Sequence, residues 1–337
     1  GVHEQVYIRT SGTTSGISLV PFSEEQLVKR MRGPGLKSEE RLLKFGPLEF
    51  SVTLYLRFLY RADTVVLREG NSLSDLSLFC EKLKITQVVL SRVHLESLAR
   101  FHEKSKECFP IGVKVISIGS AVPSTLRKRI IKYVSPLFYV RYGTTESSFV
   151  SVAGPNEHDE SESSGFIVDN VKLEVVGNDD MPLPRGSKGN IRLKTVGSAT
   201  HYYKDPKKTA EKFRKGWFYP GDIGYLRPDD SLIVIGRSDD MLIMGGMNID
   251  PGEIEGVLEA HQCVRSAVVV GLSFEVYAQI PVAAVTLNEG AKLTNTELKI
   301  YARDRLGYRS PRKIIITDVL PFSENGKILK QKVREMF

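Results

Sequence analysis

The chain has 337 residues, 41% of them hydrophobic, which is enough to bury a sizeable core and predicts a globular protein of two domains. Its 47 basic and 40 acidic side chains give a formal net charge of +7, which suits anionic small molecules and does not by itself indicate nucleic acid. Its three cysteines, far apart in the sequence, exclude a disulfide framework or a zinc cluster, and no apolar run reaches membrane-spanning length, so we expect a cytoplasmic protein without a membrane span.

The first half of the chain alternates between short apolar runs and apolar residues at helical spacing. Two strand–helix–strand units are expected, over residues 64–67, 73–84 and 87–90, and over residues 113–118, 124–134 and 137–140. This alternation is typical of an α/β domain with a parallel sheet, whose ligands bind beyond the carboxyl ends of the strands. Gly119 and Gly143 lie at two of these ends.

The pattern changes after a polar, acidic loop over residues 156–165. Short alternating segments punctuated by glycine and proline then predict a small antiparallel or barrel-like β subdomain, over residues 172–176, 189–193 and 231–235. From about Asp240 onward a small α+β domain is expected, with helices from residue 251 and over 294–306, and strands over 266–272 and 313–319. We therefore expect an N-terminal domain over residues 1–238 and a C-terminal domain over residues 239–337.

Six short motifs fall in an order that is hard to obtain by chance. They are residues 11–14, 142–146, 219–222, 236–240, 245–246 and 326–327. A hydroxyl-rich glycine loop suits a triphosphate, and a carboxylate after a glycine turn suits Mg²⁺. An aspartate followed by an arginine suits a ribose, and a final lysine suits a reacting carboxylate. These motifs resemble the adenylate-forming superfamily, which includes acyl-CoA synthetases, the adenylation domains of nonribosomal peptide synthetases and the luciferases.

The resemblance implies a nucleotide site in the N-terminal domain. Its residues would be Ser11, Gly12, Thr13, Thr14, Gly119, Ser120, Ala121, Tyr142, Gly143, Thr144, Thr145, Asp222 and Arg237. In the family's pattern Tyr142 stacks on the adenine, Thr145 bonds the α-phosphate and Glu146 binds the metal ion. The alternatives from the residues alone are a plain Ser/Thr turn for the loop and an acid at a helix N-terminus for Glu146. Asp222 is otherwise a turn residue, and Arg237 a member of a buried ion pair.

The C-terminal domain of the family rotates between an adenylating pose and a thioester-forming pose. By resemblance Lys327 is the catalytic lysine, which holds the substrate carboxylate and the α-phosphate, and Asp239 is the hinge. Gly245 and Gly246 would face the incoming thiol, since two adjacent glycines cost backbone entropy and need a reason such as close approach. An exposed lysine and a solvated turn acid are the alternatives for Lys327 and Asp239.

Two features depart from the family pattern. The phosphate loop usually continues Gly-x-Pro-Lys-Gly, and Ser18 stands here in the place of the lysine, so we expect ATP to bind weakly relative to AMP. Only about ten residues precede the loop, where the family carries a long N-terminal part. This predicts a fragment, a naturally short form or half of a pair, and a homodimer or a partner chain that covers an apolar face.

The expected activity is that of an AMP-forming acid–thiol ligase. A carboxylic acid reacts with ATP to give an acyl-adenylate and pyrophosphate, and the acyl group then moves to the thiol of coenzyme A or of carrier-protein phosphopantetheine. ATP, Mg²⁺ and that thiol are the expected cofactors, and no nucleic acid is an expected partner. The alternative is a degenerate, non-catalytic or conditional nucleotide- or acyl-binding protein on the same fold. An NAD-dependent enzyme is disfavoured, because no Gly-x-Gly-x-x-Gly follows a strand.

Overall fold

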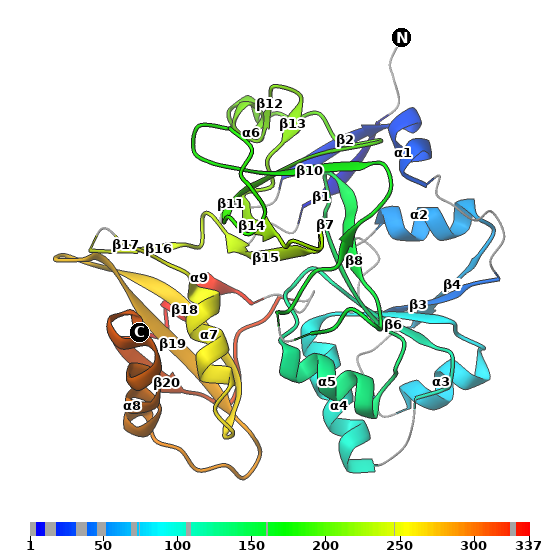
Figure 1. Ribbon diagram of the computed structural model, residues 1–337. Helices are drawn as coiled ribbons and strands as arrows, with labels where there is room; N and C mark the ends of the chain where they lie inside the picture. Colours follow the sequence, from blue (N-terminus) through cyan, green and yellow to red (C-terminus); the bar gives the residue numbers. More distant parts are fainter. Residues whose placement is uncertain are drawn as a thin grey trace. The chain divides into compact units, whose positions relative to one another are not determined.

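The computed structural model of the chain describes residues 5–10, 18–31, 39–45, 52–68, 73, 75–105, 109–159, 161–245, 247–323 and 328–337. The chain divides into two compact units (Figure 1). The first holds the described residues up to Pro220 together with Gly224–Val234, and the second holds Gly221–Ile223, Ile235–Ser323 and Ile328–Phe337. The division therefore runs through two strands, β14 (Asp222–Leu226) and β15 (Leu232–Arg237).

The first unit contains the expected parallel sheet, with seven strands in the order β4-β3-β5-β6-β7-β8-β9. The strands are β3 (Arg41–Phe45), β4 (Thr64–Arg68), β5 (Gln87–Leu90), β6 (Lys114–Ile118), β7 (Phe138–Thr144), β8 (Ser148–Ala153) and β9 (Phe166–Ile167). Strands β3 to β7 run parallel, and β8 and β9 are added antiparallel at one edge. The α/β class predicted from the alternating pattern is confirmed.

Helices cover both faces of this sheet, because neighbouring residues of each strand are apolar on opposite sides. The helices are α2 (Val52–Tyr60), α3 (Leu76–Lys82), α4 (Arg92–Ser105) and α5 (Ser124–Tyr133). Val88 packs with α3, α4 and α5, whereas Val89 packs with α2. Helix α4 was not among the expected elements, although Leu95, Leu98 and Ala99 are buried at helical spacing.

A hairpin and a short helix open the described chain. Strands β1 (Gln5–Arg9) and β2 (Leu19–Ser23) pair antiparallel, and helix α1 (Glu24–Met31) follows directly. Ser23 and Gln26 cap α1 reciprocally: the Ser23 N–H donates to the Gln26 side chain at 2.9 Å, and the Gln26 N–H donates to the Ser23 hydroxyl at 3.2 Å. The apolar side of the hairpin thereby stays packed on α1.

The predicted β subdomain is present as a six-stranded sheet in the order β12-β13-β11-β14-β15, with β10 paired to β11. Its further strands are β10 (Val171–Val176), β11 (Gly189–Thr195), β12 (Phe213–Arg214) and β13 (Trp217–Phe218). The pairs β10–β11, β11–β13 and β12–β13 are antiparallel, as expected. Helix α6 (Pro206–Lys212) precedes β12 and begins with Asp205 as its N-cap.

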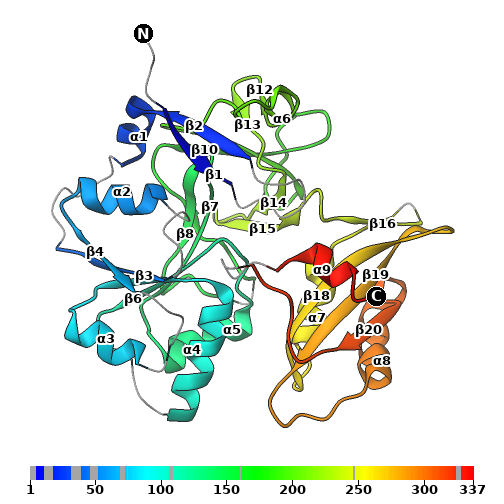
Figure 2. The same cartoon turned by 180° about the vertical axis from the view of Figure 1, so that it is seen from behind.

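The second unit is a small α+β domain, and Figure 2 shows its sheet with α9 on view. Its strands are β16 (Leu242–Met244), β17 (Met247–Ile249), β18 (Val264–Phe274), β19 (Ala278–Leu287) and β20 (Lys313–Ile316). Its helices are α7 (Pro251–Glu259), α8 (Asn295–Leu306), the 3-10 turn η1 (Gly307–Arg309) and α9 (Lys330–Arg334). Ala267 and Val269 of β18 pack with α7 and α8, and Val268 and Val270 pack with α9.

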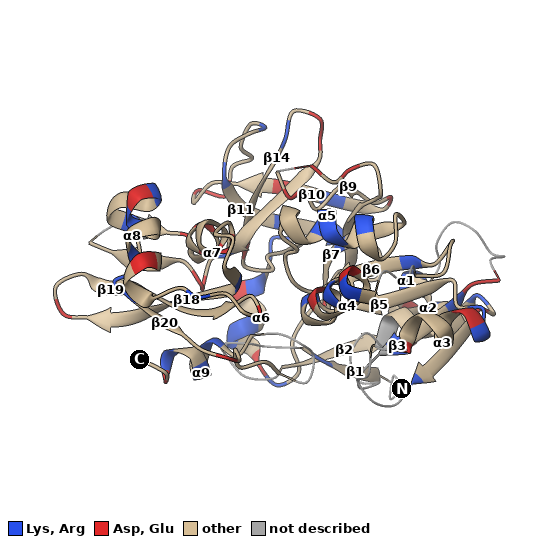
Figure 3. Cartoon of the chain, turned by 90° about the horizontal axis from the view of Figure 1, so that it is seen from below, with Lys and Arg blue, Asp and Glu red and all other residues tan. Residues whose placement is uncertain are grey.

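Charged residues are spread over the elements of both units (Figure 3). Basic and acidic side chains alternate on α8, whereas α5 carries four basic residues, Arg127, Lys128, Arg129 and Lys132. Within the described residues, no helix is both long enough and apolar enough to cross a membrane.

Candidate functional site

The Tyr142 motif lies where β7 ends and turns back into β8. The strand register shifts between Tyr142 and Gly143, and a Cβ atom on Gly143 would lie 2.2 Å from the Ser148 carbonyl oxygen. The Thr144 hydroxyl accepts a hydrogen bond from the Ser147 N–H at 3.1 Å, which closes the turn. Only glycine therefore fits the second position, and the residues that follow are held in a tight turn.

Glu146 is buried in this turn, with 8% of its surface exposed. Its carboxylate accepts a hydrogen bond from the Tyr202 hydroxyl at 2.6 Å. Arg30 of α1 is also buried; it donates to the carbonyl oxygens of Thr145 at 2.8 Å and of Glu146 at 3.4 Å, and its guanidinium lies 4.4 Å from the centre of the Phe22 ring. Burial lowers the pKa of Arg30 to about 10, and the nearby Glu146 carboxylate opposes that shift. The turn is thus fixed from two sides.

Arg30 and Tyr202 were not among the residues expected from the sequence. A basic residue at the end of an amphipathic helix normally lies in water, where the helix dipole favours it. Tyr202 lies outside the six motifs, just before α6. Sequence spacing gives no signal for either contact, because the partners are more than fifty residues away along the chain.

A magnesium ion usually keeps several waters and is held by one or two carboxylates together with substrate phosphates. Glu146 offers one carboxylate, which Tyr202 orients. In the part of the chain that the structure describes, no three His, Cys, Asp or Glu side chains gather as they would around a protein-enclosed ion. The residues present therefore fit magnesium completed by water and phosphate, and do not fit a closed metal cage.

The residues on either side of the predicted phosphate loop are hydrogen-bonded to each other. The Thr10 N–H donates to the Ser18 carbonyl oxygen at 2.9 Å, and the Ser18 N–H donates to the Thr10 hydroxyl at 3.2 Å. The predicted loop residues between them lie outside the described residues: Ser11, Gly12, Thr13 and Thr14. The strands β1 and β2 on either side fix both ends of the loop.

The second predicted segment, Gly119, Ser120 and Ala121, directly follows β6 and is exposed. Gly119 has a φ of +91°, a conformation that favours glycine. Ile118 at the end of β6 pairs with Arg141 of β7, so this segment and the Tyr142 motif lie at the same carboxyl edge of the sheet. That edge is where ligands of parallel sheets bind.

In the second unit, Asp222, Arg237 and Asp239 form a connected group. Arg237 donates to the Asp239 carboxylate at 2.9 Å and 3.2 Å, and lies 3.5 Å from the Asp222 carboxylate. Burial disfavours the charged form of Arg237, but the carboxylates of Asp239 and Asp222 outweigh it and raise the Arg237 pKa. The next acid, Asp240, pairs with Lys330 at 2.8 Å. Arg237 therefore forms ion pairs, one of them with the predicted ribose acceptor, although its side chain is 40% exposed and thus only partly buried.

Gly245 has a φ of +57°, and a Cβ atom at this position would lie 3.3 Å from the Tyr308 hydroxyl. Its N–H donates to the Tyr277 carbonyl oxygen at 3.0 Å, which ties the β16–β17 turn to the start of β19. The other predicted residues of this region, Gly246 and Lys327, lie outside the described residues. Gly245 thus occupies a turn where a larger residue would be strained.

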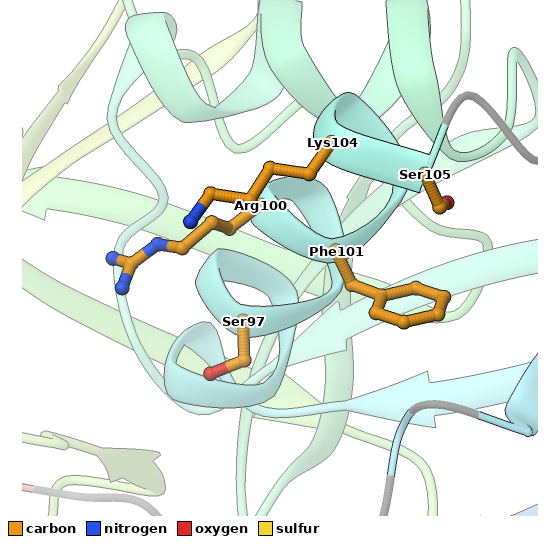
Figure 4. A pocket seen from close by; sticks show the side chains of 5 residues that line it. All are labelled: Ser97, Arg100, Phe101, Lys104 and Ser105. Atoms are coloured by element: carbon orange, nitrogen blue, oxygen red, sulfur yellow. The ribbon is translucent and has the colours of Figure 1, made fainter. Parts of the chain in front are cut away.

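A hollow of about 460 Å³ on α4 contains none of these residues (Figure 4). Its lining comes from one helix, with Arg100 and Lys104 directed away from Phe101: Ser97, Arg100, Phe101, Lys104 and Ser105. A second hollow of about 450 Å³ is lined by residues at the ends of β10 and β11, among them Lys172 and Lys194. Neither hollow is lined by a predicted site residue.

Two models of known protein families match the chain. A family model described as AMP-binding enzyme matches residues 6–203, and one described as AMP-binding enzyme C-terminal domain matches residues 253–327. Feruloyl-CoA synthase from Amycolatopsis sp is 29% identical over 309 residues, which are 90% of this chain and 62% of that protein. The chain thus spans less than two thirds of the length of this relative.

Two solved structures have similar folds. The amide bond synthetase McbA from Marinactinospora thermotolerans gives a TM-score of 0.87 at 26% identity, over 98% of this chain and 68% of that one. O-succinylbenzoate coenzyme A synthetase from Bacillus subtilis, in complex with ATP and magnesium ion, gives a TM-score of 0.83 at 25% identity, over 97% and 69%.

Proposed function

Because the chain belongs to the AMP-binding enzyme family, we propose that it activates a carboxylic acid with ATP and transfers the acyl group to the thiol of coenzyme A. In the first step a carboxylate oxygen attacks the α-phosphorus and pyrophosphate leaves. In the second step the thiol sulfur attacks the acyl carbon, AMP leaves and the thiol proton passes to solvent. The observation that carries the proposal is the buried Glu146 turn, which follows β7 at the same carboxyl edge of the parallel sheet as Gly119.

We assign the roles in the first unit from the family's motif pattern, and the position of the turn supports them. Tyr142 stacks on the adenine, Thr145 bonds the α-phosphate, and Glu146 holds magnesium, which would offset the charge of the phosphates. Arg30 and Tyr202 keep the turn in place, so that no reorganisation is needed when the nucleotide binds. The remaining nucleotide contacts are assigned to Ser11, Gly12, Thr13, Thr14, Gly119, Ser120, Ala121, Gly143 and Thr144.

The remaining roles, in the second unit and at Lys327, are assigned in the same way. Asp222 accepts hydrogen bonds from the ribose hydroxyls, and Arg237 contacts the ribose and phosphate side of the nucleotide. Lys327 stabilises the charge that develops as pyrophosphate leaves; a general base is not needed, because a carboxylate is already a nucleophile at pH 7. Asp239 is the hinge of a mobile domain over residues 239–337, and Gly245 and Gly246 face the thiol.

Two other acceptors are candidates. A carrier-protein phosphopantetheine presents the same thiol as coenzyme A. An amine is the second candidate, because the amide bond synthetase McbA is similar over nearly the whole chain.

We also propose that a second copy of the chain or a partner chain covers the apolar edge around α2 and β4. Leu59, Tyr60 and Leu67 are exposed there, with exposed fractions of 59%, 44% and 55%. Sedimentation velocity tests this assignment, and a monomer at all protein concentrations would contradict the homodimer.

ATP–pyrophosphate exchange with a panel of carboxylic acids tests the main proposal. Exchange that depends on one class of acid is the expected result. Nucleotide binding without exchange for any acid would favour the degenerate binding protein instead. Adding coenzyme A or an amine to the active acid, and weighing the product by mass spectrometry, separates the acceptors.

A further inference from the structure

Ser18 stands where the motif pattern has a lysine, yet a lysine side chain reaches this position from elsewhere. The Lys208 ammonium donates a hydrogen bond to the Ser18 hydroxyl at 2.8 Å, although the two residues are 190 positions apart. Lys208 belongs to α6, and its own N–H donates to the N-cap Asp205 at 3.0 Å. The contact therefore brings a positive charge to the C-terminal end of the predicted phosphate loop.

Hydrogen bonds from backbone N–H groups hold the helix that carries Lys208 next to Ser18. The Tyr203 N–H donates to the Leu19 carbonyl oxygen at 2.8 Å, so the segment before α6 is joined to β2 directly beside Ser18. The Tyr202 N–H donates to the Thr209 hydroxyl at 3.0 Å, which joins that segment to α6. Helix, segment and strand are thus connected by hydrogen bonds.

The same tyrosine links the lysine to the predicted metal carboxylate. The Lys208 ammonium lies 4.8 Å from the centre of the Tyr202 ring, and the Tyr202 hydroxyl donates to Glu146 at 2.6 Å. Tyr202 is buried and Lys208 half-buried. The Tyr202 side chain therefore contacts a cation with its ring and a carboxylate with its hydroxyl. A magnesium-bound polyphosphate needs both: a cation for its phosphates and a carboxylate for its metal ion.

We propose that Lys208 is the phosphate-binding cation for the β- and γ-phosphates of ATP, in place of a lysine within the loop. An ammonium has three N–H donors, and the bond to Ser18 uses one of them. Ser18, while accepting that bond, can still donate its own proton to a phosphate oxygen. The inference rests on the proposed function, and it removes the reason to expect weak ATP binding from the absence of a loop lysine.

Calorimetry of ATP and AMP binding to the full chain and its variants tests the proposal. Lys208→Met keeps the apolar stem on the Tyr202 ring and removes the charge. It should weaken ATP by about tenfold or more, the scale of one charge-assisted hydrogen bond, and change AMP by less than about twofold. Lys208→Arg should retain most of the ATP affinity, and Lys207→Met, the exposed neighbour on α6, should change neither nucleotide.

A double variant, Ser18→Lys with Lys208→Met, should recover ATP affinity by returning the charge to the loop. Equal loss of ATP and AMP in Lys208→Met, or no loss of either, would overturn the role of Lys208 while leaving the proposed function standing. A wild-type chain that binds neither nucleotide would instead reject the proposed function, and the inference with it. Thermal unfolding of each variant confirms that the fold is retained.

Discussion

The Glu146 turn and the group formed by Asp222, Arg237 and Asp239 hold their charges in different ways. Glu146 is buried, and its contacts to Tyr202 and Arg30 are hydrogen bonds between neighbouring elements of one packed unit. Arg237 and Asp239 each leave 40% of their side chains exposed. Buried hydrogen bonds to a charge are strong and costly to break, whereas exposed ion pairs contribute little and can exchange partners. The first group is thus suited to hold a ligand rigidly, and the second to change its contacts during a reaction cycle.

The largest effect is expected outside both groups, at the proposed catalytic residue Lys327. Lys327→Ala should reduce adenylate formation by about 10²-fold or more, the scale for loss of one preorganised charge at a transition state. Thioester formation from a supplied acyl-adenylate should be largely unchanged, because the lysine acts only in the first step. Exchange and single-turnover assays measure the two half-reactions, with Lys332→Ala, an exposed lysine of α9, as the control. Equal loss in both steps would refute the assigned role.

The second largest effect is expected in the Glu146 turn, the group suited to hold a ligand rigidly. Tyr202→Phe keeps the ring and removes the hydrogen bond to Glu146, so the free energy of unfolding should fall by about 1.5–3 kcal/mol. Urea denaturation measures it. Tyr203→Phe, at an exposed neighbour, should cost less than about 0.5 kcal/mol. Similar values for the two variants would mean that the Glu146 turn does not depend on its buried partner.

A comparable effect on binding is expected in the second group. Asp222→Ala should weaken AMP binding by roughly 1–3 kcal/mol, because the ribose hydroxyls lose a charged acceptor. Calorimetry with AMP measures the change, and circular dichroism checks that the variant is folded. Unchanged affinity in a folded variant would return Asp222 to the role of a turn residue.

The smallest effect should come from the exposed ion pair. Asp239→Asn removes a charge that Arg237 bonds through two N–H groups, yet the loss of stability should stay below about 1 kcal/mol. The difference from the wild type should shrink further in about 1 M salt, where charges are screened. A larger, salt-independent loss in urea denaturation would place this pair in the rigid class with Glu146.

Much of the fold could be predicted from the sequence, since apolar periodicity is set by which face of an element is buried. Residues 87–90 and 189–193 fall within the observed β5 and β11, and the helix expected from residue 251 is α7. Helix α4 was missed although its buried residues follow helical spacing. Within the candidate site, the motifs indicated Glu146, Asp222 and Arg237. They could not predict Arg30, because its partners are backbone carbonyls far along the chain, and such contacts leave no local pattern.

The bonds between Thr10 and Ser18 have a consequence for engineering. A segment whose two ends are hydrogen-bonded to each other is a suitable place for exchange, because these bonds join Thr10 and Ser18 directly. Lengthening such a segment is also inexpensive, since each doubling of loop length costs only about 0.6 kcal/mol. Phosphate loops of other lengths and sequences could therefore be grafted onto this hairpin, which would make the chain a scaffold for comparing them in one unchanged surrounding.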